Sequence, residues 1–145
     1  MNRQEGFYCP HCNTSVTSQD KKAVNLNAKL ESEFFSVEFP ISLPARLGTY
    51  GAEYPSYIEL KKGAKVSFYC PHCNTSITLP EKETHAYLKM TDSQQREKVI
   101  IFNQIFGEHD TFVFDLDTHK IVAAYGDDQN RYIMEFNNNI NFFGV

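Results

Sequence analysis

The chain has 145 residues, of which 41% are hydrophobic, 22% charged and 14% aromatic. This composition excludes a disordered tail and a collagen-like repeat, and the length suits one ordinary folded domain. The net charge of −4 argues against the basic surface with which general nucleic-acid binders neutralise phosphates. Four cysteines are too few for a disulfide-dense secreted scaffold.

The charge is unevenly distributed along the chain. Residues 1–83 carry nine Lys/Arg and nine Asp/Glu, whereas residues 84–145 carry five and nine, so the acidic excess lies in the second part. The first residues lack the apolar stretch of a signal peptide, and apolar runs such as 99–102 are far shorter than the roughly 20 residues of a membrane span. We therefore expect a soluble cytoplasmic protein without membrane contact.

The first feature along the chain is an eleven-residue segment that occurs twice. Residues 7–17 are FYCPHCNTSVT and residues 68–78 are FYCPHCNTSIT, which differ only where Val16 is replaced by Ile77. The sequence shows no similarity between the two regions outside this motif. We call the two segments knuckle 1 and knuckle 2 and interpret them as matched half-sites rather than as units of a repeat array.

Each knuckle holds a C-x-x-C pair, and two such pairs can complete a tetrahedral shell of four thiolates. The predicted metal ligands are Cys9, Cys12, Cys70 and Cys73, with no cysteine left over. Zinc is the expected ion, and iron fits the same four-sulfur site. Because no position is left for water, we expect a structural role. His11 and His72 lie between the cysteines, and we expect them to be exposed and not to be ligands.

The residues around the cysteines suit a tight turn. The residue after the second cysteine usually has a positive φ, a conformation that asparagine tolerates, and Asn13 and Asn74 occupy these positions. Pro10 and Pro71 preset one turn dihedral. We expect the Phe-Tyr pair before each cysteine to arrive as a strand and the Thr-Ser-Val/Ile-Thr segment to return.

The pattern resembles the zinc-ribbon and rubredoxin-like group, whose members hold one metal between two CPxC-type knuckles on β-hairpins. The layout also looks like that of uncharacterised bacterial proteins. One departure is the spacer, since 57 residues separate Cys12 from Cys70, against roughly 15–20 in common ribbons. The resemblance therefore implies a zinc-ribbon-like module over 1–83 with a β-rich insert between its knuckles.

Two other interpretations of the cysteines stay open. The Phe-x-Cys-Pro-His-Cys pattern is similar to the active site of thioredoxin-fold, disulfide-forming enzymes, which implies a thiol-disulfide oxidoreductase using the CPHC dithiols. The context opposes it, because only eight residues precede Cys9 and the segment Asn-Thr-Ser-Val-Thr is a poor helix former. Plain disulfides or free thiols are the other alternative.

The insert carries strand signals. Apolar and polar residues alternate from Val24 to Leu30 and over 35–39, and we expect strands there and at 58–60 and 66–68. Pro40, Pro44, Gly48, Gly51 and Pro55 predict a long connection that holds the aromatic stretch 50–57. The segment 61–65 is turn-like and contains the basic cluster Lys61, Lys62 and Lys65.

The second part, 84–145, is expected to be a β-meander that shares the core of 1–83. Strands are predicted at 85–90 and 98–102, and 112–114 is expected to pair with 121–123. The segment 91–106 also fits a helix, but its β-branched run favours a strand. At the end, 136–145 is expected to dock as a last strand; the alternative is an apolar end that binds another chain.

Two acidic turns, 107–110 and 126–128, are candidates for a second site. Their side chains Glu108, His109, Asp110, Asp127 and Asp128 could form a second metal site or an acid/base pair. Because Gly and Asp are also typical of tight turns, we interpret both segments as turns. We expect His85 and His119 to be surface residues.

The sequence thus predicts a mostly β fold: a zinc-ribbon-like module with a β-rich insert between two CPHC knuckles, plus a C-terminal β-meander. The predicted function is the binding of one structural zinc ion in a small protein-interaction or adaptor module, with another protein as the expected partner and no catalytic role. A zinc-ribbon nucleic-acid adaptor is the remaining alternative, although the charge disfavours it. The sequence leaves the oligomeric state open, and matched half-sites also permit a metal shared between two chains.

Overall fold

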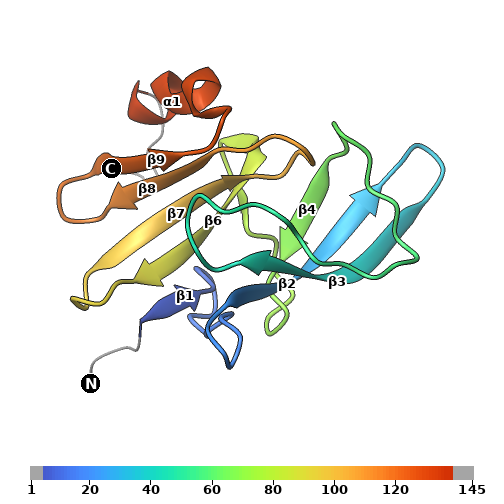
Figure 1. The fold of residues 1–145 in the computed structure, drawn as a ribbon, viewed down its shortest axis with the longest axis horizontal. Helices are drawn as coiled ribbons and strands as arrows, with labels where there is room; N and C mark the ends of the chain where they lie inside the picture. Colours follow the sequence, from blue (N-terminus) through green and yellow to red (C-terminus); the bar gives the residue numbers. More distant parts are fainter. Residues whose placement is uncertain (1–4, 139–145) are drawn as a thin grey trace.

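A computed structural model describes residues 5–138 and contains two antiparallel β-sheets and one helix (Figure 1). The mostly β fold that the sequence predicts is confirmed. The elements are β1 (Gly6–Tyr8), β2 (Ala23–Glu31), β3 (Ser36–Pro44), β4 (Val66–Tyr69), β5 (Thr78–Leu79), β6 (Lys82–Thr91), β7 (Glu97–Asn103), β8 (Thr111–Asp115), β9 (Lys120–Tyr125) and α1 (Gln129–Asn138).

The larger sheet has the strand order β1-β6-β7-β8-β9, and β5 also pairs with β6. The smaller sheet has the order β3-β2-β4.

Strand β2 follows the predicted alternation, with Val24, Leu26 and Ala28 buried. Pro40, which we expected to begin the long connection, instead lies within β3. Strand β3 is an edge strand, where the missing N–H of proline is tolerated.

The two knuckles carry the chain between the sheets in opposite directions. Knuckle 1 begins within β1, which pairs with β6 in the larger sheet, and its last residue, Thr17, pairs with Val24 of β2 in the smaller sheet. Knuckle 2 begins within β4, which pairs with β2, and ends at the start of β5, which pairs with β6. Strands β2 and β6 are therefore each bordered by segments from both knuckles.

One large hydrophobic cluster lies between the sheets. It contains Val24, Leu26 and Ile41 of the smaller sheet together with Leu88 and Ile100 of the larger one. The boundary that we expected between the two parts of the chain, 1–83 and 84–145, falls within β6. A second cluster, formed by Leu79, Val99, Ile101, Phe112, Phe114 and Tyr132, packs under α1 on the other face of the larger sheet.

Several predicted strands are confirmed. The strand preferred for 98–102 is β7, and Val113 of β8 pairs with Ala123 of β9. The segment 58–60 is not a strand, because its backbone lies outside both sheets while the Ile58 side chain is buried.

The prediction that the meander continues beyond β9 is wrong, because residues 129–138 form α1. The adjacent side chains of Tyr132 and Ile133 both pack on the second cluster, which a helix permits and a strand, with its alternating faces, does not. Most of the predicted docking strand 136–145 lies outside the described residues. Within residues 5–138, no helix is long and apolar enough to cross a membrane.

Candidate metal centre

The two knuckles fold into the same turn. In knuckle 1, the Asn13 N–H donates to the Cys9 carbonyl at 2.9 Å, and in knuckle 2 the Asn74 N–H donates to the Cys70 carbonyl at 2.8 Å. Asn13 and Asn74 have φ values of 64° and 57°, which confirms the positive φ expected at both positions. The returning segments pair with the incoming strands through the bridges Tyr8–Ser15 and Tyr69–Ser76, also as expected.

The four cysteines that the sequence singles out lie together. Their Sγ atoms all lie within 4.8 Å of one another. Within residues 5–138, they are the one group of three or more His, Cys, Asp or Glu side chains close enough together to hold a metal ion. The Cys9–Cys73 and Cys12–Cys70 Sγ distances are both 3.7 Å. Sulfurs about 2.3 Å from a central zinc would be about 3.8 Å apart, whereas a disulfide needs about 2.05 Å. The cluster is therefore compatible with a metal site, and all four cysteines are free thiols.

The first cysteine of each pair is buried and the second is partly exposed. The Cys9 sulfur accepts the N–H of His11 at 3.3 Å, and the Cys70 sulfur accepts the N–H of His72 at the same distance. Burial nevertheless raises the pKa of Cys9 to about 12, and it raises the pKa of Cys70 as well. In the absence of a cation, the buried pair therefore favours the neutral thiol.

The pKa values of the two partly exposed cysteines, Cys12 and Cys73, are lowered instead. Hydrogen bonds from the side chain and backbone of Thr14 lower the pKa of Cys12 to about 6. Those of Thr75 lower the pKa of Cys73. Four thiolates this close together require a compensating cation, because like charges in a partly buried site disfavour one another. The arrangement can therefore bind a cation, and its charge would stabilise all four thiolates.

His11 and His72 are exposed, as expected, and neither is close enough to the sulfurs to be a ligand. They nevertheless connect the knuckles. The His11 Nε2 atom lies 3.0 Å from the Ser76 carbonyl, and the His72 Nε2 atom lies 3.1 Å from the Ser15 carbonyl. Each histidine thus hydrogen-bonds to the returning segment of the opposite knuckle. The sequence analysis missed these bonds, although both histidines stood inside the repeated motif.

The surroundings of the two knuckles differ. In knuckle 1, the Phe7 N–H donates to Thr17 Oγ1 at 2.8 Å. In knuckle 2, the Phe68 N–H donates at 3.0 Å to Oε1 of Gln104, a buried side chain that also accepts from Thr78 Oγ1 and donates to the Glu83 carbonyl. Sequence reasoning did not identify Gln104, because nothing in its neighbourhood marks it as a buried partner of a strand 36 residues away.

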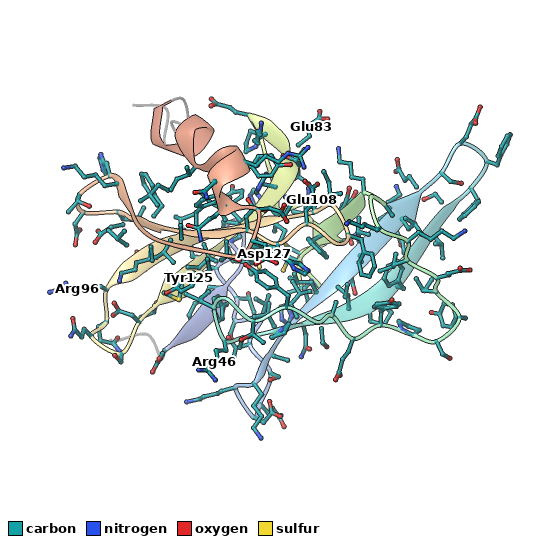
Figure 2. The ribbon with its side chains drawn as sticks, turned by 45° about the horizontal axis from the view of Figure 1, so that its top comes forward. Arg46, Glu83, Arg96, Glu108, Tyr125 and Asp127 are labelled. Atoms are coloured by element: carbon teal, nitrogen blue, oxygen red, sulfur yellow. The ribbon has the colours of Figure 1, made fainter. Side chains whose placement is uncertain are left out.

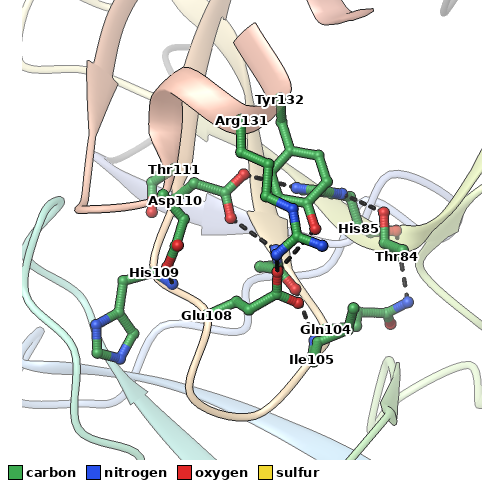
Figure 3. A network of polar contacts seen from close by, with 12 residues as sticks. Thr84, His85, Gln104, Ile105, Glu108, His109, Asp110, Thr111, Arg131 and Tyr132 are labelled. Carbon is green, nitrogen blue, oxygen red and sulfur yellow. Dashed lines mark hydrogen bonds and ion pairs between the residues drawn. The ribbon is translucent and has the colours of Figure 1, made fainter. Parts of the chain in front are cut away.

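The expectation that His85 is a surface residue is wrong. His85 and Asp110 are fully buried, and the His85 Nε2 atom lies 2.7 Å from Asp110 Oδ2 (Figure 3). Thr84 Oγ1 lies 2.7 Å from the His85 Nδ1 atom, and Asn103 donates to Asp110 Oδ1 at 2.7 Å. The burial is tolerable because these hydrogen bonds satisfy both buried groups.

Two of the remaining acidic side chains of these turns, Glu108 and Asp128, hold α1 and the loop before β8. Glu108 Oε1 accepts from Arg131 at 2.6 Å and from the Tyr132 hydroxyl at 2.8 Å (Figure 3). Asp128 accepts the His109 N–H at 2.8 Å. Glu108, Asp110 and Asp128 are thus partners within the fold, as our interpretation of turns implies, while Asp127 is exposed. His119, expected at the surface, is exposed.

Comparison with protein-family models finds no match, and comparisons with curated proteins and with solved structures likewise find none. The geometry of the four cysteines is therefore the main indication of function.

Proposed function

We propose that Cys9, Cys12, Cys70 and Cys73 bind one zinc ion with a structural role. The observation that carries the proposal is the spacing of the four sulfurs, whose two 3.7 Å distances match the edges of a zinc–thiolate tetrahedron. A single ion would connect the two knuckles and, through β1 and β4, the two sheets. The zinc-ribbon and rubredoxin-like resemblance is consistent with this role, and iron would fit the same sulfur set.

The proposed centre is not catalytic. Four thiolates fill a tetrahedral shell, so no position is left for a water or substrate. An oxidoreductase would require a reactive thiolate at Cys9 or Cys70, and burial raises the pKa of both. We therefore propose a non-enzymatic, cytoplasmic interaction module whose parts 1–83 and 84–145 form one unit and whose partner is another protein. The nucleic-acid alternative has weaker support, since Lys65 of the basic cluster lies 3.5 Å from Glu83.

The test is metal analysis of the purified protein with thiol counting before and after chelation. One zinc per chain, with four thiols protected until the metal is removed, would support the proposal. Two disulfides and no metal would contradict it. One metal per two chains would replace the intrachain site with a shared one. Spectra of the cobalt-substituted protein would identify the ligands, since four thiolates give intense tetrahedral bands.

A further inference from the structure

A half-open cavity of about 420 Å³ lies between the two sheets. Protein interiors hold few voids larger than a water molecule, whereas small-molecule sites occupy roughly 300–1,000 Å³, so this cavity has the size of a ligand site. Its walls come from both sheets, and the segment 46–54 covers it. The wall residues include Phe7, Ile41, Phe68, Leu88, Ile100 and Phe102.

The lining of the cavity is mostly apolar, and the polar side chains of Gln104 and Tyr50 have partners within the protein. Gln104 Oε1 accepts hydrogen bonds from the Phe68 N–H of β4 and from Thr78 Oγ1, and Gln104 Nε2 donates to the Glu83 carbonyl. The Tyr50 hydroxyl lies 2.9 Å from Thr111 Oγ1, and the Tyr50 ring stacks on His109 at 4.5 Å. Among the described residues, the one buried side-chain atom without a partner is Thr91 Oγ1, which does not line the cavity. An apolar cavity of this kind favours an apolar occupant over ordered water.

The rim supplies one charged group that is free to bind a ligand. Arg46 lines the edge of the cavity, and its side chain lies at the outside of the molecule (Figure 2). No carboxylate within the described part of the chain forms an ion pair with it. Glu108, the acidic residue of the rim, is already bound by Arg131 and Tyr132. Among the lining side chains, Arg46 is therefore the charged group left to bind a ligand, while Asp127 near Tyr50 is an exposed carboxylate outside the lining.

We propose that this cavity binds a monoanionic amphiphile, with its apolar chain between the sheets and its anionic head beside Arg46. The volume equals about 14 water molecules at roughly 30 Å³ each, which suits one chain of about ten carbons and is too small for the two acyl chains of a phospholipid. This inference does not depend on which metal the cysteines bind.

Decanoate is the probe, titrated into the purified full-length protein and followed by methyl NMR and calorimetry. We expect saturable one-to-one binding that shifts the methyl resonances of Ile41, Leu88 and Ile100. Absence of saturation at millimolar decanoate, or shifts confined to other residues, would overturn the proposal. Vesicles of dioleoylphosphatidylglycerol form a second arm, and binding to them without binding of free decanoate would equally overturn it.

Two variants test the geometry. Ala52→Phe places a ring in the cavity and should abolish binding, whereas Ser56→Phe, an exposed position of the same connection outside the lining, should retain it. Leu60→Phe is the second cavity-filling variant if Ala52→Phe does not fold. Full decanoate binding by a folded cavity-filled variant would place the ligand elsewhere and overturn the site.

Arg46→Gln tests the head group. The substitution should weaken decanoate binding about three- to fivefold, because an exposed ion pair contributes modestly to affinity. Binding of decanol, which has no charge, should be unchanged. Equal weakening of both ligands, or of neither, would contradict the assigned role of Arg46. Zinc content is measured in parallel, so that failure of this proposal can be distinguished from failure of the metal proposal.

Discussion

The two knuckles have almost the same sequence and the same turn, yet they are anchored to the rest of the protein differently. In both, an asparagine with positive φ closes the turn and a histidine reaches the opposite knuckle. The N–H of Phe7 is satisfied locally by Thr17, whereas that of Phe68 is satisfied by the distant Gln104. The eleven-residue motif therefore determines the local turn, while the surrounding sheets determine how firmly each turn is held.

The largest expected effect comes from removing a ligand from either knuckle. Cys9→Ser and Cys70→Ser should each abolish stable metal binding and unfold the region around the knuckles. Structural zinc sites contribute on the order of 10–16 kcal/mol in small domains, as much as the whole stability of a typical domain. Metal content and circular dichroism would measure the loss. Retention of metal and fold by one variant but not by the other would contradict a symmetrical four-thiolate centre.

The anchoring of the knuckles should respond unequally to mutation. Gln104→Ala leaves the buried Phe68 N–H and the Glu83 carbonyl without this partner, so we expect a loss of about 3 kcal/mol in the free energy of unfolding. Thr17→Ala removes one hydrogen-bond acceptor at a partly exposed site and should lower the free energy of unfolding by about 1 kcal/mol. Urea unfolding of the metal-loaded proteins would measure both values. Equal losses would mean that the two anchors are energetically equivalent.

Local chemistry made the cysteine cluster predictable from the sequence. The ligand type, the C-x-x-C spacing and Asn13 and Asn74 all lie within one short motif, and the incoming and returning strands follow from the same eleven residues. The alternation in β2 likewise predicted its buried face correctly, because a half-buried strand has a period of two.

The parts that escaped prediction depend on partners far away in the sequence. His85 stands in an ordinary strand pattern, and its burial depends on Asp110, 25 residues later. Helix α1 follows a Gly-Asp-Asp turn that also suits a meander, and its position depends on the contact of Tyr132 with Glu108. The crossing of the knuckles between the sheets depends on strand pairings that no local pattern specifies.

The histidine bonds offer a finer comparison. His11→Ala and His72→Ala each remove one exposed hydrogen bond between the knuckles, so we expect each to lower the free energy of unfolding by about 0.5 kcal/mol. The effect of His11→Ala should be slightly larger, because the His11 ring also lies edge-on to Tyr87 at 6.2 Å. Both variants should release metal to a chelator faster than the wild-type protein. Release rates unchanged in both would mean that the bonds do not hold the knuckles together.

The smallest effect concerns the exit from knuckle 1, where Asp20 closes a turn that knuckle 2 lacks. Asp20 Oδ1 accepts the Ser18 hydroxyl at 2.6 Å and the Lys22 N–H at 3.0 Å, and these bonds lower the pKa of Asp20. A carboxyl group whose folded-state pKa is lowered stabilises the fold above its unfolded value of about 3.9, and this contribution is lost as the pH falls through the folded-state value.

Asp20→Asn should therefore destabilise the protein slightly and by the same amount at pH 7 and pH 5, since Asp20 is ionised in both the folded and unfolded states across that range. Urea unfolding at the two pH values would measure the difference, with Glu81→Gln, at the exposed exit of knuckle 2, as the control. A difference that grows between pH 7 and pH 5 would mean that the pKa of Asp20 is raised in the folded state, because the folded protein would then bind the proton more tightly than the unfolded chain.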